Sequence, residues 1–382
     1  MRTIRGMLFT DKMIFGPGEL VIEGDVIEKI DLCEEGQLTE KEVGQYILPG
    51  LIDIHFHGCA GHDLCDGTVD AIRAIAFYEL THGITSICPA TMTLAEEMLV
   101  DICDTSASAA ESEMLDSRIP LGDILKGIYL EGPFISIEKK GAQNPAFIQK
   151  PDIDMLRRLQ RAAHGLIKIA AIAPESEEAL ECIKAGQDDF RFTLAHTCAD
   201  YETAKKAIKA GAHHITHLYN AMPPFTHREP GVIGAAAESD SVTAELICDG
   251  IHIHPCVVRN TFRLFGAERI VLISDSMMAT GMEDGEYALG GQKVWVNGSL
   301  ATLEDGTIAG SVTNLFDCMR MAIRMGVPKE EAVRAATANP AKAIGIEREY
   351  GSLQVGKKAD VLVTDREFNL LEVIKSGITA FK

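Results

Sequence analysis

Eight short runs rich in apolar and β-branched residues recur along the middle of the chain, and helix-like stretches separate most of them. The runs lie at residues 51–57, 84–90, 126–132, 167–175, 192–197, 213–218, 243–250 and 270–276. Several intervening stretches, such as residues 68–83 and 200–211, stop at a glycine, as helices commonly do. Alternating strands and helices with eight strands predict an α/β fold, a (β/α)8 TIM-type barrel. A doubly wound parallel sheet is the alternative.

The two ends of the chain have a different pattern. Short strand-like segments punctuated by glycine and aspartate fill the first part of the chain and return at its end. We therefore expect a small β-sandwich domain formed by residues 1–48 together with 346–382, and a barrel domain of residues 49–345. Residues 281–310 are rich in glycine and contain strand-like pieces, which predict a hairpin or lid beside the functional site.

Charge and composition exclude several classes of protein. The 382-residue chain has a formal net charge of -20, which argues against a nucleic-acid partner, although a few local cations suffice for a small anionic substrate. No apolar run approaches the roughly 18 residues of a membrane span. The N-terminal segment also lacks a signal-peptide core, so we expect a cytoplasmic protein with no membrane partner. The ten cysteines form no C-x-x-C pair and are expected to be reduced thiols.

Ionisable side chains occupy the ends of several predicted strands, where barrels of this type carry their chemistry. The first strand ends in His55 and His57, and their i, i+2 spacing turns both toward one face. Other strands end in Glu131, His196, His217, Asp249 with His252 just after it, and Asp275. By contrast, His213 and His214 lack this placement and are expected to be structural.

A single histidine or carboxylate at a strand end is usually a hydrogen-bonded structural residue or a helix cap. Four histidines (His55, His57, His196 and His217) with Glu131 and Asp275, at the catalytic ends of five strands, favour one shared site instead. Imidazole and carboxylate together suit Zn, Fe(II), Mn or Co. The strand ends therefore predict a divalent metal site.

Longer segments resemble those of a known enzyme family. They are "LPGLIDIHFHG", "YLEGPF", "KKGAQNP", "LAHT", "THLYNAMPPFTHREPG", "DGIHIHP", "ISDSM", "AGS" and "ATANPAKAIGI" with "GSLQVGKKADVLV", and they extend from about residue 48 to residue 363. On these segments the chain resembles the amidohydrolase superfamily and, within it, the N-acetylglucosamine-6-phosphate deacetylase family. "THLYNAM" followed by "REPG" is the most specific part, whereas "PGLIDIHFHG" marks the superfamily.

The resemblance implies a role for each matching residue. Glu131, His196 and His217 match the three metal ligands of the family. Some members lack the histidine pair and hold one metal, so His55 and His57 imply one or two divalent ions per subunit. The residues that match substrate-contacting positions are Gln143, Asn220, Ala221, Arg228, His252 and Ile308. The family also implies a homodimer, in which the loop that bears Arg228 can reach the substrate of the neighbouring subunit.

Within that set, the resemblance separates several kinds of contact. Arg228 and His252 match phosphate-contacting positions, and Ile308 matches a position that lines the acetyl pocket. Gln143 stands where other members carry a histidine. An amide can still bond the substrate there, but it cannot donate from a charged imidazolium.

The implied reaction hydrolyses the acetamido group of N-acetylglucosamine 6-phosphate to glucosamine 6-phosphate and acetate. A divalent ion lowers the pKa of its bound water to roughly 7, which supplies a metal-bound hydroxide as nucleophile. Asp275 matches the catalytic aspartate and would act as general base, then general acid.

Three alternatives stay open. N-acetylgalactosamine 6-phosphate differs at one hydroxyl, and no residue distinguishes the two sugars. A dihydroorotase-like member would carry a carboxylated lysine at the end of the fourth strand, whereas Lys168 begins that strand. A non-catalytic interaction protein of the same fold is the remote alternative, because such proteins usually lose ligands that this chain keeps.

Overall fold

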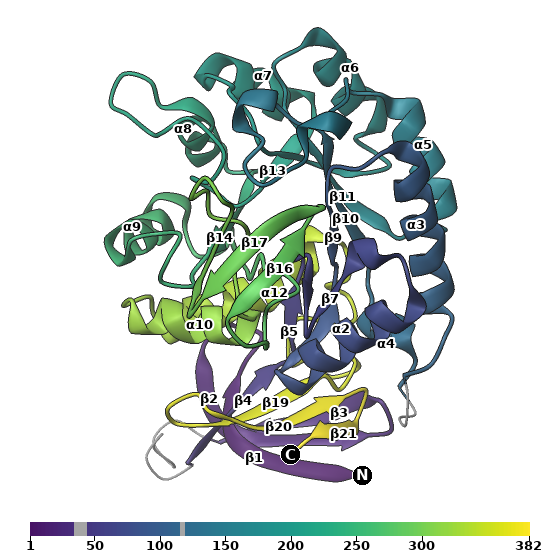
Figure 1. Ribbon diagram of the computed structural model, residues 1–382. Helices are drawn as coiled ribbons and strands as arrows, with labels where there is room; N and C mark the ends of the chain where they lie inside the picture. Colours follow the sequence, from purple (N-terminus) through teal and green to yellow (C-terminus); the bar gives the residue numbers. More distant parts are fainter. Residues whose placement is uncertain (34–43, 115–118) are drawn as a thin grey trace.

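The centre of the molecule is a closed ring of parallel strands, seen in the computed structural model of residues 1–33, 44–114 and 119–382 (Figure 1). β5 (Leu51–Asp53) pairs with β8 (Ile84–Ile87), and a seven-stranded sheet continues in the order β9-β10-β11-β12-β13-β14-β15. Beyond the last strand, the amide of Asp275 donates to the carbonyl of His55 at 3.0 Å, and the amide of His57 donates to the carbonyl of Ser276 at 2.7 Å. These bonds join the two ends of the ring, so the predicted (β/α)8 barrel is confirmed and the doubly wound sheet is wrong.

The strand ladders are shorter than the runs predicted from the sequence. The remaining ladder strands are β9 (Ala90–Thr91), β10 (Ile128–Phe134), β11 (Ile167–Ile172), β12 (Arg191–Leu194), β13 (Ala212–Ile215), β14 (Thr243–Ile247) and β15 (Ile270–Ile273). His196, His217 and Asp275 each lie two residues beyond the last ladder residue of their strand. Each of these residues therefore lies just beyond a regular strand, where the backbone can turn toward the barrel axis.

Helices connect the strands and cover the outside of the ring (Figure 1). They are α2 (Val69–Thr81), α3 (Glu96–Ala110), α4 (Leu121–Ile124), α5 (Ile153–Ala162), α6 (Glu177–Gly186), α7 (Tyr201–Ala210), α8 (Gly231–Glu238), α9 (Pro255–Phe265), α10 (Leu315–Arg324), α11 (Lys329–Ala336) and α12 (Ala338–Ala343), with the short η1 (Leu64–Asp66), η2 (Ile137–Lys139) and η3 (Pro145–Phe147). Thr68, Asp152, Ser176 and Asp200 each accept a backbone N–H in the first turn of α2, α5, α6 and α7. Such caps satisfy amides that a helix start leaves unpaired.

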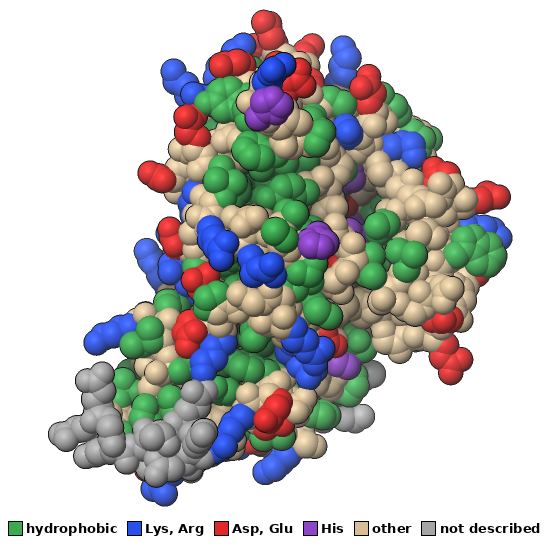
Figure 2. Space-filling model, turned by 90° about the vertical axis from the view of Figure 1, so that its left-hand side faces the viewer, with side chains coloured by type: hydrophobic (Ala, Val, Ile, Leu, Met, Phe, Trp, Pro, Cys, Tyr) green, Lys and Arg blue, Asp and Glu red, His purple; other side chains and the backbone are tan. Residues whose placement is uncertain are grey.

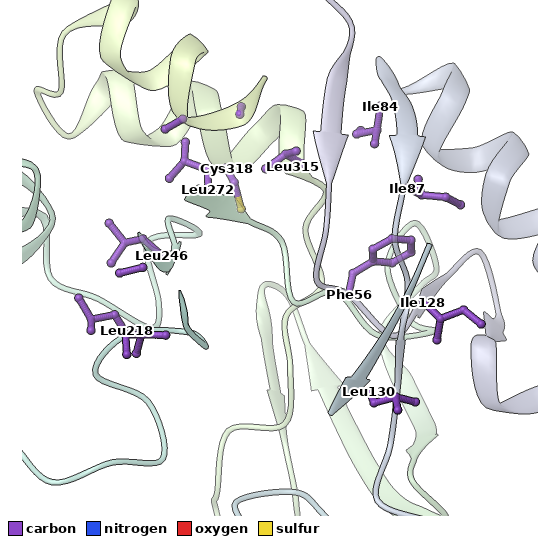
Figure 3. Close-up of a cluster of buried hydrophobic side chains, with 14 of the residues drawn as sticks. Phe56, Ile84, Ile87, Ile128, Leu130, Leu218, Leu246, Leu272, Leu315 and Cys318 are labelled. Carbon is purple, nitrogen blue, oxygen red and sulfur yellow. The ribbon is translucent and has the colours of Figure 1, made fainter. Parts of the chain in front are cut away.

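Two apolar clusters lie on opposite sides of the strands. The outer cluster packs strands against helices, and Figure 3 shows Leu272 of β15 next to Cys318 of α10 within it. The inner cluster fills the barrel and includes Tyr129 of β10 and Ile273 of β15. Because side chains alternate along a strand, Glu131 points inward like Tyr129. The chain therefore builds an apolar floor beneath the polar strand ends.

The chain termini form a second sheet at the end of the molecule where Figure 1 marks N and C. Its order is β21-β20-β19-β4-β1-β2-β3, from β1 (Arg2–Phe9), β2 (Phe15–Glu23), β3 (Val26–Leu32), β4 (Gln45–Pro49), β19 (Val361–Asp365), β20 (Leu370–Lys375) and β21 (Ile378–Phe381). Both termini contribute strands, as expected, but they form one seven-stranded sheet and not the expected β-sandwich. This sheet has its own apolar cluster, which includes Leu20, Ile47 and Val361. Residues 34–43 of the predicted N-terminal strands, and 115–118 of the barrel, lie outside the described residues.

The glycine-rich segment forms the predicted hairpin. β16 (Gly285–Leu289), β17 (Gln292–Asn297) and β18 (Leu300–Thr302) make a three-stranded antiparallel sheet, and a two-stranded ribbon of β6 (Gly58–Cys59) and β7 (His62–Asp63) follows the first barrel strand. The side-chain amide of Gln292 donates to the carbonyl of Ala142, which ties the hairpin to the loop after β10. Among the described residues, no helix is long and apolar enough to span a membrane.

Candidate active site

Four histidine side chains converge on the carboxylate of Glu131, which projects from β10. The Nε2 atoms of His217 and His196 lie 2.9 Å and 3.0 Å from Oε1 of Glu131. The Nε2 atom of His57 lies 3.2 Å from Oε2, and that of His55 lies 3.5 Å from Oε1. All five residues are buried. The ends of the first, third, fifth and sixth barrel strands therefore meet at one carboxylate.

Fixed acceptors hold the opposite ring nitrogen of three of these histidines. Nδ1 of His55 lies 2.8 Å from Oε2 of Glu245. Nδ1 of His196 lies 2.8 Å from a backbone carbonyl in η2, and Nδ1 of His57 lies 3.3 Å from one in β9. An acceptor at Nδ1 requires the proton to be there, so each neutral ring presents its Nε2 lone pair toward Glu131. Metal-ligating histidines are held in the same way.

The donor atoms fit divalent ions. The ligand atoms of His55, His57 and Glu131 lie within 4.8 Å of one another, and so do those of Glu131, His196 and His217. The buried Nε2 atom of His55 has no hydrogen-bond partner among the described residues, as expected of a nitrogen that binds a metal. These two overlapping groups can hold one ion each, with Glu131 shared.

Electrostatics favour a cation at this place. Burial raises the pKa of Glu131, but the surrounding histidines hold it well below its ordinary range. Burial lowers the pKa of His57, yet its contacts with Asp275 and Glu131 outweigh this and raise it to about 10. The carboxylates are thus ionised and attract positive charge, which protons or a metal ion can supply.

Asp275 lies beside both groups at the end of the last barrel strand. Its Oδ1 atom is 3.4 Å from Nε2 of His57 and 3.8 Å from Nε2 of His55. Burial raises the pKa of Asp275, but the imidazoles of His57 and His55 more than offset this, so the pKa is lowered and the carboxylate is ionised at neutral pH. A carboxylate in this state can accept a proton from a reacting water.

His196, His217 and Asp275 share an unusual backbone conformation. The φ angles of His196, His217 and Asp275 are 44°, 25° and 50°. Such positive values are uncommon outside glycine and cost about 1–3 kcal/mol each. The strand ends therefore turn sharply at these residues, which directs three side chains into one place.

A cavity of ≈ 550 Å³ lies over this cluster, and Figure 2 shows a hollow with histidine side chains inside it. Ten of the twelve residues proposed from the sequence line the cavity: His57, Glu131, Gln143, His196, His217, Asn220, Ala221, His252, Asp275 and Ile308. His55 is fully buried behind it. Arg228 is exposed on the loop between β13 and α8 and does not line the cavity.

Gln143, which the sequence predicts to contact substrate, lines the cavity and also contacts Glu131. Its Nε2 atom donates to Oε2 of Glu131 at 2.6 Å, and its Oε1 atom accepts the amide of Thr93 at 2.7 Å. Both ends of the carboxamide are thus occupied. In this arrangement Gln143 orients the shared carboxylate.

Cationic side chains lie on the cavity wall. Nδ1 of His252 is 2.7 Å from Oδ2 of Asp249. Burial lowers the pKa of His252, but this bond outweighs it and raises the pKa. The sequence analysis missed Lys139 and Lys140, which also line the cavity. The signal was present, because "EKKG" lies in the loop after a catalytic strand.

Comparisons with known proteins agree with this geometry. The sequence model of the amidohydrolase family matches residues 46–379, nearly the whole chain. The chain belongs to the amidohydrolase family, and the resemblance seen in its motifs is confirmed.

Individual relatives indicate which kind of amidohydrolase the chain is similar to. The N-acetylglucosamine-6-phosphate deacetylase of Bacillus subtilis (strain 168) is 39% identical over 337 residues, which cover 88% of this chain and 84% of that protein. The N-acetylgalactosamine-6-phosphate deacetylase of Escherichia coli O157:H7 is 32% identical and covers 89% of each chain. A mutant N-acetyl-D-glucosamine-6-phosphate deacetylase from Mycobacterium smegmatis, solved in complex with N-acetyl-D-glucosamine-6-phosphate, has a TM-score of 0.90 at 31% identity and covers 100% of this chain and 99% of its own.

Proposed function

We propose that this protein hydrolyses the acetamido group of N-acetylglucosamine 6-phosphate to glucosamine 6-phosphate and acetate. The observation that carries the proposal is the convergence of four Nε2 atoms on Glu131, with Asp275 beside them, under a cavity of ≈ 550 Å³. Similarity to deacetylases named for this substrate, over most of the chain, supports the choice of reaction.

The proposed metal ligands and Asp275 have different roles in the reaction. Glu131 and the histidines would hold a divalent ion, and that ion would supply Lewis acidity for activating water and polarising the acetyl carbonyl. Asp275 takes a proton from the attacking water at Oδ1 and then delivers it to the departing nitrogen. Water adds to the carbonyl carbon, the carbon–nitrogen bond breaks, and the amine leaves with the transferred proton.

The cations around the cavity are proposed to bind the phosphate. His252 is positioned for this by Asp249, and Lys139 and Lys140 lie on the same cavity wall. Arg228, which is exposed, would complete the phosphate site of a neighbouring subunit in a homodimer. A homodimer and a cytoplasmic location are part of the proposal. Asn220, Ala221 and Ile308 would contact the sugar and its acetyl group.

N-acetylgalactosamine 6-phosphate is the second candidate substrate. One relative at 32% identity is named for that sugar, compared with 39% for the relative named for N-acetylglucosamine 6-phosphate. The glucosamine epimer is therefore favoured. A non-catalytic role is not favoured, because every ligand that the family resemblance requires is present and converges.

The test is acetate release measured on both hexosamine 6-phosphates, with the unphosphorylated sugars as controls. We expect the highest kcat/KM with N-acetylglucosamine 6-phosphate. A higher kcat/KM with the galactosamine epimer would change the substrate but keep the reaction. If neither sugar phosphate yields acetate in the presence of a divalent metal, the proposed function is wrong.

A further inference from the structure

Glu245 is a charged residue in the middle of β14, between the buried residues Ala244 and Leu246. It is fully buried, and its carboxylate contacts the side chains of His55 and His214. A buried carboxylate is stable only when hydrogen bonds and opposite charges compensate it. The hydrogen-bond partners of Glu245 therefore indicate its role.

Each oxygen of Glu245 has a histidine partner. Oε2 lies 2.8 Å from Nδ1 of His55 and accepts the backbone amide of His217 at 3.1 Å. Oε1 lies 3.0 Å from Nε2 of His214. Two of these three partners are proposed metal ligands, one from each candidate ion group. Glu245 thus lies behind the metal site and touches both halves of it.

The positions of the protons follow from the chemistry of the partners. A carboxylate can only accept, so His55 must donate from Nδ1 and His214 from Nε2. Nδ1 of His214 lies 2.6 Å from Oγ1 of Thr243, whose hydroxyl can donate to it. Because the proton of His55 is on Nδ1, its free lone pair is on Nε2. That atom is the buried nitrogen without a hydrogen-bond partner, and it lies 3.5 Å from Oε1 of Glu131.

We propose that Glu245 is a positioning residue that fixes the tautomer and ring orientation of His55 for the ion held by His55, His57 and Glu131. His214, which the sequence marked as merely structural, holds the other oxygen of Glu245. Glu245 does not line the cavity and so does not touch substrate. This inference rests on the proposed metal-dependent function.

The test compares Glu245→Gln with the wild-type protein in a Zn²⁺ titration against a chromophoric chelator. Glutamine keeps the shape of the side chain but removes the charge and one acceptor. Loss of such an outer partner weakens metal binding by about 10–100-fold. We expect this loss for one of the two ions, and a smaller change for the other.

Repeating the Zn²⁺ titration in a His57→Asn variant shows which ion depends on Glu245. His57→Asn removes one ligand from the group that contains His55. In that background, Glu245→Gln should change the affinity of the remaining ion by no more than about twofold, because the two substitutions then act on the same ion. A loss of about tenfold or more there would overturn the assignment to His55.

The matched control is Glu79→Gln on α2. Glu79 is also fully buried, and its carboxyl oxygens have no hydrogen-bond partner among the described residues. The same substitution at that position should leave both zinc affinities unchanged. A loss at Glu79 equal to that at Glu245 would indicate a general effect of a buried amide and would overturn the proposal.

The outcomes separate this inference from the proposed function. If the wild-type protein binds no ion, the proposed function fails. If it binds two ions and Glu245→Gln binds both as tightly, only the role of Glu245 is wrong. If Glu245→Gln does not fold, ¹⁵N NMR of the histidine-labelled, zinc-loaded wild-type protein decides, with His55 assigned by a His55→Asn variant. We expect a proton on Nδ1 of His55, and a proton on its Nε2 would overturn the proposal.

Discussion

The Oδ1 atom of Asp275 lies 3.4 Å from the Nε2 atom of His57, so the proposed proton carrier contacts a proposed metal ligand. Asp275→Asn keeps the shape of the side chain but removes the proton acceptor. We expect kcat for acetate release to fall by about 10²–10⁴-fold. Bound metal, measured on the same sample, should stay constant. Asp240→Asn, at an exposed position, is the control and should keep full activity. Undiminished acetate release from Asp275→Asn contradicts the proposed role.

The number of bound ions is predicted to depend on His57. Its Nε2 atom is 3.2 Å from Oε2 of Glu131, and it belongs to the group that does not include His196 or His217. His57→Asn should therefore lower the metal content by one ion per subunit and leave the other ion in place. Elemental analysis after dialysis against a metal-buffered solution measures this. Equal metal content in the two proteins would show that this group holds no ion.

Substrate binding is predicted to weaken at alkaline pH. The bond with Asp249 raises the pKa of His252 above its ordinary value of 6.5. The imidazolium is therefore present below the raised pKa and is lost as the pH rises through it. We expect KM for the phosphorylated sugar to rise as the pH increases through this raised pKa, and this rise to be absent in His252→Gln. A KM that rises equally in both proteins would rule out His252 as the titrating group.

Arg228 is predicted to set the preference for phosphorylated over free sugar. A hydrogen bond to a charged group contributes about 1.5–3 kcal/mol, so Arg228→Ala should reduce the ratio of kcat/KM values by about 10–100-fold. Lys205→Ala, which removes an exposed ion-paired cation elsewhere, is the control. If the preference survives Arg228→Ala, the phosphate assignment is wrong.

A mixed dimer tests whether Arg228 acts across subunits. One subunit carries Arg228→Ala and the other carries Asp275→Asn. If the arginine serves the neighbouring site, one of the two sites regains both an intact Asp275 and an intact Arg228. We expect such dimers to regain about half of the specific activity of the wild-type protein. No recovery would place Arg228 within the site of its own subunit.

The strand ends made much of this site predictable from the sequence. Strand–helix alternation indicated the barrel, and barrels gather the ends of their strands at one opening, so His55, Glu131 and His196 had to lie close together. Period-two alternation also holds along β14, where Glu245 and Ile247 share a face. Glu245 was missed because it lies in the middle of the strand, where the sequence gives no sign that the side chains beside it include histidines of the paired strand β13 and of the first barrel strand.

Other features depend on contacts that a linear pattern does not contain. The side-chain amide of Gln143 contacts Glu131, which is 12 residues away in the sequence, and the backbone of Thr93, which is 50 residues away. The exposure of Arg228 depends on the path of the loop after β13. The positive φ of His217 arises where the strand ladder stops, a boundary that apolar patterning predicts to within a few residues only.

The most direct measurement follows acetate release from N-acetylglucosamine 6-phosphate before metal removal, after dialysis against a chelator, and after a divalent metal is restored. The two ligand groups around Glu131 predict that activity disappears with the metal and returns in proportion to the metal restored. Zn²⁺, Mn²⁺, Co²⁺ and Fe²⁺ are each added separately to identify which ions restore it. Full activity in the metal-free protein, shown to be folded by circular dichroism, would contradict the proposed metal-dependent hydrolysis.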